Sequence, residues 1–248
     1  MTWLERKEGH QIFFNRDERR TRRPARPPEP REQRGVRYLA PEDGDFGGSW
    51  IAVNEAGLTL ALLNGDSSRD EEAKDPEGGY LSRGLLLVSL IDCATVATVL
   101  ERLHGSALDR CRSFLLFTFE PFHPPQLTRW TGSELLPATA VDGGVPLVSS
   151  SFDTEEVRAR RTELFRRMKQ EWKGDPAALH LAYHASHLPA RGAYSPCMHR
   201  PDARTVSFSR VAVDSGRAVF DYRADSPCGG SFPGTNRNWT TSAELVIP

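Results

Sequence analysis

Strand signals occupy both ends of this chain, and the clearest helix signals lie between them. Short apolar or alternating segments bounded by Gly, Asn or Asp occur at 11–15, 49–54, 58–64, 85–90, 114–119 and 126–130. Two clean strands are expected at 205–213 and 217–222, joined at Asp214-Ser215-Gly216, and a last one at 245–247. Segments of this kind are typical of β-strands. This order predicts an α+β fold, with antiparallel sheets and helices segregated on their faces.

Three helices are expected in the middle of the chain. One runs from about 94 to 103 and stops at Gly105, and a shorter one spans about 177–187. The best marked begins after Asp153, which with Glu156 three residues on makes a capping-box pattern. The residues that follow it at helical spacing are Val157, Arg161, Leu164, Phe165, Met168 and Trp172.

Length and composition favour one large domain over residues 1–248, because 38% hydrophobic and 26% charged residues are ordinary globular usage. The net charge of −1 argues against general affinity for nucleic acid or acidic membrane. The longest apolar run, 84–100, contains Asp92 and is too short to cross a bilayer comfortably. No secretion signal is visible near Met1. We therefore expect a cytoplasmic protein without integral membrane association.

An unusual segment rich in arginine and proline follows residue 16. Residues 16–34 hold eight arginines, four acidic residues and Pro24, Pro27, Pro28 and Pro30. Because prolines at that density disfavour a helix or a central strand, we expect an exposed loop at about 19–35. No aromatic residue lies between Asp17 and Val36 to stack on bases, so nucleic acid is not an expected partner.

The cysteines and histidines give no metal-binding pattern. Cys93, Cys111, Cys197 and Cys228 show no close pairing, which speaks against a metal knuckle and a disulfide framework. His180, His184 and His187 form one helical face, which is either a metal site or a surface with solvated imidazoles; the second is favoured because no carboxylate or cysteine is spaced to complete a site. In the segment 197–200, Cys-Met-His-Arg, at most Cys197 and His199 share a face. No metal is expected.

Three segments together carry a family resemblance. Residues 12–20 read Ile-Phe-Phe-Asn-Arg-Asp-Glu-Arg-Arg, residues 47–54 read Gly-Gly-Ser-Trp-Ile-Ala-Val-Asn, and residues 60–64 read Leu-Ala-Leu-Leu-Asn. They resemble the NRDE family, also called the transport-and-Golgi-organisation family, a branch of the N-terminal-nucleophile hydrolase superfamily. The resemblance implies a four-layer αββα sandwich whose first strand carries the nucleophile at its start.

Family members usually begin Met-Cys and use the exposed cysteine for amide chemistry, whereas this chain begins Met1-Thr2-Trp3. Because Thr2-Trp3-Leu4 matches an interior segment of relatives that begin Met-Cys-Thr-Val-Thr-Trp, the resemblance implies a start a few residues upstream. Thr2 lies three residues beyond that cysteine position, so its side chain should face the opposite way. We expect the chain as written to be a poor enzyme.

The resemblance implies a site at the end of the second strand. An N-terminal nucleophile is activated by its own α-amino group, and other residues orient the amine and stabilise the oxyanion. Arg16 would lower the pKa of the thiol and Asp17 would hold the amine; the alternative is an ion-pair cluster that caps a hairpin. Asn64 is placed like an oxyanion donor, or else ends a strand in a turn. Arg200 would bind a substrate carboxylate.

The predicted site residues are expected to converge on one pocket near the start of the chain; they are Asn15, Arg16, Asp17, Asn64 and Arg200. Ser149, Ser150 and Ser151 stand where relatives have Ser-Asn, so any oxyanion role there is weaker. Arg83, in a Ser-Arg-Gly motif, is expected to be a solvated residue at the entry to a strand.

The predicted activity is hydrolysis of a small-molecule amide or acyl ester without a cofactor. The alternative is a non-catalytic protein that binds or traffics haem or an acyl lipid, in which case haem is the expected ligand. A free cysteine or threonine at the pocket favours hydrolysis, and a blocked, exposed start favours binding.

Overall fold

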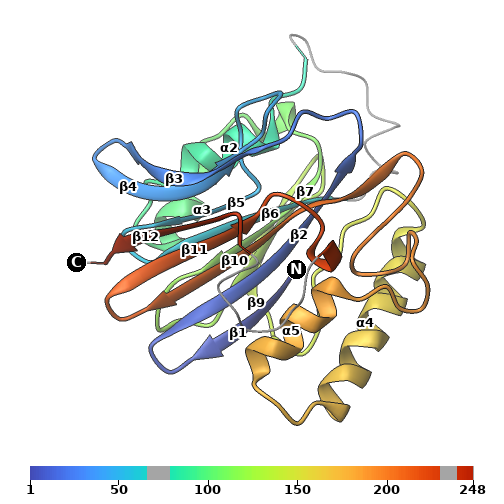
Figure 1. Cartoon of the computed structure of the whole chain (residues 1–248). Helices are drawn as coiled ribbons and strands as arrows, with labels where there is room; N and C mark the ends of the chain where they lie inside the picture. The colour runs from blue at the N-terminus through green and yellow to red at the C-terminus, as the bar shows by residue number, and fades with distance from the viewer. Residues whose placement is uncertain (66–78, 230–238, 248) are drawn as a thin grey trace.

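Two antiparallel sheets lie face to face in the computed structural model, which describes residues 1–65, 79–229 and 239–247 (Figure 1). Helices α2 (Arg83–Leu90) and α3 (Val96–His104) cover the outer face of the larger sheet. Helix α5 (Pro176–Ala185) packs on the outer face of the smaller sheet, and helix α4 (Thr154–Glu171) packs against α5. The expected four-layer αββα sandwich is confirmed.

The smaller sheet has the strand order β1-β2-β10-β11-β12. Its strands are β1 (Thr2–Arg6), β2 (Gly9–Arg19), β10 (Ala203–Asp214), β11 (Arg217–Arg223) and β12 (Thr241–Val246). Both ends of the sequence therefore meet in one sheet. The expected hairpin is confirmed, since Asp214 pairs with Arg217.

The larger sheet follows the sequence order from β3 to β9. Its strands are β3 (Arg26–Gln33), β4 (Val36–Glu42), β5 (Ile51–Asn54), β6 (Thr59–Asn64), β7 (Phe114–Phe119), β8 (Gln126–Trp130) and β9 (Leu135–Ala140). Strands β4 and β9 were not predicted from the sequence. Short 3-10 turns, η1 (Leu108–Arg110) and η2 (Pro227–Gly229), lie in the connections.

The predicted exposed loop at about 19–35 is wrong, because β2 continues to Arg19 and residues 26–33 form β3. Strand β3 is the edge of the larger sheet and pairs with β4. An edge strand tolerates Pro27, Pro28 and Pro30, since a missing N–H on its open side breaks no ladder. The segment is mostly exposed, as expected, but it is folded.

The predicted strand at 85–90 is also wrong, because these residues form helix α2. Ser82 caps the helix by accepting a hydrogen bond from the backbone N–H of Leu85, and Leu87 and Leu90, three residues apart, are its buried side chains. A short continuous apolar run cannot be assigned to a strand or a helix by periodicity alone.

The other helices lie close to their predicted positions. Asp153 precedes α4, but it adopts a left-handed conformation with φ 41° and makes no side-chain cap. Its carboxylate instead accepts a hydrogen bond from the Tyr194 hydroxyl. No helix within the described ranges is long and apolar enough to span a membrane.

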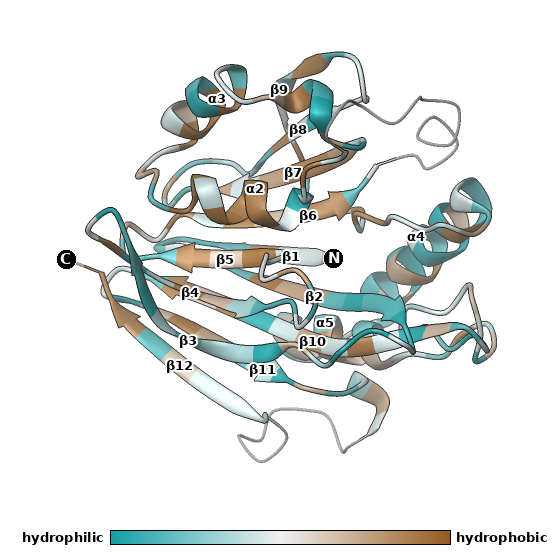
Figure 2. Ribbon diagram, turned by 90° about the horizontal axis from the view of Figure 1, so that it is seen from above, coloured by the Kyte–Doolittle hydropathy of each residue, from teal (hydrophilic) through white to brown (hydrophobic). Residues whose placement is uncertain are grey.

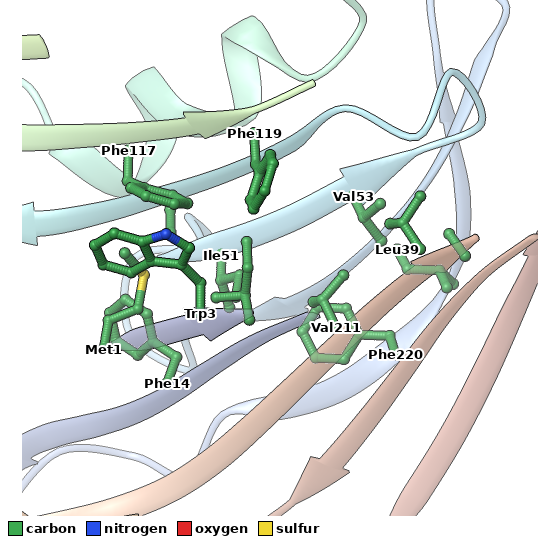
Figure 3. Packing of buried hydrophobic residues seen from close by; sticks show 14 of the residues in the cluster. Met1, Trp3, Phe14, Leu39, Ile51, Val53, Phe117, Phe119, Val211 and Phe220 are labelled. Carbon is green, nitrogen blue, oxygen red and sulfur yellow. The ribbon is translucent and has the colours of Figure 1, made fainter. Parts of the chain in front are cut away.

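Aliphatic and aromatic side chains fill the space between the two sheets (Figure 3). Trp3 of β1 packs against Phe117 of β7, with ring centroids 4.9 Å apart. From β2, Ile12 and Phe14 point into this core. Phe13 between them points the other way, toward α5. The residues of β2 that follow continue this alternation and reach the candidate site.

Candidate active site

A cavity of about 1140 Å³ lies beside the start of β1 and the end of β2. All five predicted residues line it, together with Met1. The lining contains seven arginines and four acidic residues, so the cavity wall carries excess positive charge. These are Arg16, Arg19, Arg22, Arg83, Arg112, Arg161 and Arg200, and Asp17, Glu18, Asp43 and Asp202. The catalytic roles of the five residues remain predictions.

Arg16 is held in an ion-pair cluster on the larger-sheet side of β2. Its guanidinium bonds to Asp43, lies 3.5 Å from Glu18 and stacks 4.1 Å from the centre of the Trp50 ring. Burial would raise the pKa of Asp43, but hydrogen bonds from backbone N–H groups and the charges of Arg16 and Arg22 together lower it below its usual value. Arg16 therefore pairs with the Asp43 carboxylate, as in the ion-pair alternative, although it also lines the cavity.

Asp17 faces the opposite side of β2, toward α4. Its carboxylate accepts a 2.6 Å hydrogen bond from Thr205 and lies 3.7 Å from the guanidinium of Arg161. A register shift in β10 between Thr205 and Ser207 lies directly opposite. Burial raises the pKa of Asp17, while Arg161 and the Thr205 hydrogen bond reduce the rise. Since 27% of the side chain is exposed, the carboxylate belongs to the cavity wall.

Arg161 of α4 is the main site residue that the sequence interpretation missed. It is only 8% exposed, and it donates hydrogen bonds to the carbonyls of Tyr194 and Ala193. The signal was present, because this arginine occupies the apolar face of the helix beside Val157 and Phe165. A charged residue in such a position requires buried partners.

The α-amino group of Met1 lies in the cavity wall near these two charges. It donates a 2.8 Å hydrogen bond to the carbonyl of Leu147. Burial, with a smaller contribution from Arg161, lowers the pKa of this amine to about 5, and Asp17 opposes the shift. The amine is therefore mostly unprotonated at neutral pH.

Asn15 ties β2 to the segment after α5. Its side-chain amide donates 2.9 Å hydrogen bonds to the carbonyls of His184 and Pro196. Its buried Oδ1 has no hydrogen-bond partner among the described residues, which leaves an acceptor beside the cavity. Asn15 therefore positions this wall.

Asn64 and Arg200 reach the cavity from different elements. Asn64 ends β6, pairs with Phe114 and is exposed, and its amide makes no side-chain hydrogen bond within the described part of the chain. Arg200 pairs with Asp202 at 2.7 Å and lies 5.4 Å above the centre of the Phe152 ring. Asn64 is thus available to a ligand, while Arg200 must leave an exposed carboxylate to bind one.

The histidines of α5 were predicted wrongly as solvated imidazoles. His180 and His184 are each 2% exposed, and both bond to the Thr2 hydroxyl, at 2.6 and 3.0 Å. Burial lowers the pKa of His180 to about 4 and that of His184 well below its usual value. Thr2 itself is 1% exposed and does not line the cavity. This hydroxyl is part of a buried polar layer.

The remaining predicted motifs also border the cavity. Arg83 is the first residue of α2 and bonds to the Ser113 carbonyl, so its predicted place at a strand entry is wrong. Ser149, Ser150 and Ser151 all line the cavity. Gly48 is needed beside α2, because a Cβ there would lie 2.5 Å from a backbone atom of Gly84. None of the four cysteines lines the cavity.

The fold is that of the N-terminal-nucleophile hydrolases. A variant of conjugated bile acid hydrolase from Clostridium perfringens with leucine in place of an arginine aligns over 96% of this chain and 92% of its own, with a TM-score of 0.50 and 12% identity. A cysteine-to-alanine variant of the same enzyme aligns over 99% and 91%, with a TM-score of 0.50 and 13% identity.

The family model for Transport and Golgi organisation 2 matches residues 11–168, and the chain belongs to this family. The family resemblance seen in the sequence is thereby confirmed. No curated protein matches the chain significantly.

Proposed function

We propose that the cavity is a hydrolytic site for a small acyl amide or acyl ester, arranged as in N-terminal-nucleophile hydrolases. The observation that supports this most directly is the position of the start of β1, which lies in the cavity wall where Arg161 and Asp17 influence the charge of the Met1 α-amino group. An ordinary N-terminal amine has a pKa of about 7.7–8.0. One lowered to about 5 is a free base at neutral pH and can accept the proton of a nucleophile.

The proposed roles follow from the contacts. Asp17, held by Thr205, orients the amine, and Asn64, whose amide is available, stabilises the oxyanion. Arg200 binds a negatively charged group of the substrate. Arg16 is paired with Asp43, and its positive charge would lie opposite the position of the nucleophile, where it would lower the pKa of a thiol.

The nucleophile is the group that this chain does not offer to the cavity. The Met1 thioether has no proton to lose, and the Thr2 hydroxyl is buried between two histidines. Thr2 pairs with Phe13, so a β1 strand extended by three residues in this register would place its first residue opposite Arg16. That residue would lie on the same face as Met1 and Trp3, next to the cavity.

With a cysteine in that position, its thiol proton passes to the α-amine and its sulfur attacks the acyl carbon. The amine then protonates the leaving amine or alcohol, and water hydrolyses the resulting thioester.

The lining favours an acyl chain that carries a negative charge. Excess arginines supply the attraction for an anion. Apolar side chains provide the surface for the chain, and they include Phe14, Trp50, Leu62, Leu63, Leu147 and Val148. The free state of all four cysteines supports our further proposal of a cytoplasmic location.

The test compares two proteins in which Met1 is replaced by Met-Cys-Thr-Val or by the matched control Met-Ala-Thr-Val. Release of amino acid is followed from N-acyl amino acids of increasing chain length. We expect hydrolysis by the cysteine protein alone, and a loss of at least about 100-fold in the same protein with Asp17→Asn. Equal rates for the two proteins, or none for either, would contradict hydrolysis at this site. Haem binding by both without hydrolysis by either would support the ligand-binding alternative.

A further inference from the structure

A second group of reactive side chains lies outside the cavity lining, where the segment after α5 meets η2. Its four members are His187, Cys197, His199 and Cys228, and their ligand atoms all lie within 4.8 Å of one another. They come from two segments: His187, Cys197 and His199 lie in the connection from α5 to β10, and Cys228 lies in η2. The group could not be predicted from spacing along the sequence, because Cys228 lies 29 residues beyond His199.

Two of the distances within this group match the edges of a tetrahedral metal site. Zinc lies about 2.3 Å from a thiolate sulfur and about 2.0–2.1 Å from an imidazole nitrogen, so a tetrahedral S–N edge is about 3.5 Å. His199 Nε2 lies 3.5 Å from Cys197 Sγ and 3.4 Å from Cys228 Sγ. Two edges therefore already have the required length.

His187 is the fourth member of the group. Its ring centre lies 5.1 Å from that of His199. Its Nε2 is buried and has no hydrogen-bond partner among the described residues. Buried polar atoms nearly always have a hydrogen-bond partner or bind an ion, and a metal ion would satisfy this nitrogen.

We propose that His187, Cys197, His199 and Cys228 bind one zinc ion in a structural Cys2His2 site. Two thiolates and two imidazoles suit zinc better than magnesium or calcium, which prefer oxygen ligands. Four protein ligands complete the tetrahedron and leave no position for a reacting water, which distinguishes a structural from a catalytic zinc site.

Binding requires one local change. As the side chains lie, Nδ1 of His199 accepts a 3.4 Å hydrogen bond from Arg191, so its proton is on Nε2, which faces the two sulfurs. A metal at Nε2 moves the ring proton to Nδ1, and the Arg191 side chain must then turn away. Arg191 is exposed, so this movement displaces no buried group.

The proposed zinc would fix one wall of the cavity. Pro196, Met198 and Arg200 alternate with the ligands in the sequence and line the cavity, whereas none of the four ligands does. The ion would tie this segment to η2 and hold the wall in place. The proposal does not depend on hydrolysis.

The test uses the full chain with its affinity tag removed, purified under reducing conditions, incubated with zinc and freed of excess metal. We expect about one zinc per chain by mass spectrometry. Cobalt in its place should give the visible bands of a tetrahedral site and a thiolate charge-transfer band. A chelator should lower the Tm by at least about 5 °C.

Cys228→Ser and His199→Asn are the informative variants, because both residues are only half-buried and their replacement should preserve the fold. Each should weaken zinc binding by at least about tenfold. The matched controls, Cys93→Ala and His123→Gln, should bind zinc like the unchanged chain. A chain that takes up no zinc, or variants that bind it as before while circular dichroism shows them folded, would overturn the proposal. A Cys197–Cys228 disulfide that persists in zinc-free, non-reduced protein, with no zinc uptake after reduction, would also overturn it.

Discussion

The two helix layers of the sandwich differ in what they bury. The buried side chains of helices α2 and α3 are all apolar, namely Leu87, Leu90, Val96, Val99 and Leu103. Helices α4 and α5 bury Leu164 and Phe165, but also Arg161, His180 and His184. In Figure 2, α4 carries many residues in hydrophilic colours, whereas α2 is mostly hydrophobic in colour.

This difference separates an apolar helix layer from the layer that contains the proposed sites. Buried polar groups cost free energy unless they are paired, so an apolar layer is the more stable arrangement. The α4–α5 layer retains arginine and histidine next to the cavity, and the proposed zinc site lies at the end of the same layer. Departures from an apolar core are expected to concentrate at functional sites.

The largest expected effect concerns the apolar layer. Leu90→Ala removes a fully buried side chain of α2. It should lower the free energy of unfolding by about 3 kcal/mol, because a cavity is left behind. Denaturant unfolding measures the loss, and metal analysis should show zinc content unchanged. A change in zinc content would show that the two layers are not independent.

The second effect concerns acid stability. The folded-state pKa of His180 is lowered to about 4, chiefly by burial and further by Lys169 and the N-terminal amine. Since the unfolded value is about 6.5, stability is complete above that pH and is lost as the pH falls toward 4. His180→Gln should recover on the order of 2 kcal/mol of the loss at pH 5.

The matched control for this variant is His104→Gln, an exposed histidine of α3. Denaturant unfolding between pH 7 and 4.5 compares the variants with the unchanged chain. A residual pH dependence is expected from His184 and His10, whose pKa values are also lowered by burial. If His180→Gln and His104→Gln gave the same pH dependence, the polar layer would not be the source of acid sensitivity.

A smaller effect is expected from Arg161→Met, which keeps the length of the side chain but removes its charge. Asp17 and two carbonyls lose a donor, so unfolding free energy at pH 7 should fall by about 1–2 kcal/mol. The pKa of the α-amine should rise, since Arg161 helps to lower it. An unchanged amine pKa would remove Arg161 from the proposed site.

The smallest effect is expected one turn earlier on the same helix. Arg158 is exposed, and Arg158→Ala should change the free energy of unfolding by less than about 0.5 kcal/mol. The measurement is the same denaturant titration. A loss as large as that of Arg161→Met would indicate a general effect of charge on α4.

The order of strand and helix patterns along the sequence allowed prediction of the α+β class, whereas the four-layer arrangement was predicted from the family resemblance. The family resemblance also predicted that the five candidate site residues would lie at one cavity, and all five line it. The sequence could not assign 85–90, where a continuous apolar run fits a helix or a strand equally well. The position of β3 at the edge of the larger sheet could not be predicted either, because sheet order is set by pairing between distant segments.

The burial of His180 and His184 and the clustering of His187, Cys197, His199 and Cys228 could not be predicted for a related reason. Thr2 and His180 are 178 residues apart, and only the packing of α5 against β1 brings them into contact. The polar face of α5 was therefore indistinguishable from a solvated one. Arg161 could have been recognised, since it stands among apolar residues at helical spacing.

The pKa of the α-amino group tests most directly whether this cavity prepares an N-terminal amine as a base. In protein whose intact mass shows Met1 retained, the amine can be labelled with ¹³C-methyl groups and its NMR signal followed from pH 4 to 9. We expect titration near pH 5, and a shift when Arg161 is replaced. Titration at the ordinary value of about 7.7–8.0 would contradict the proposed site.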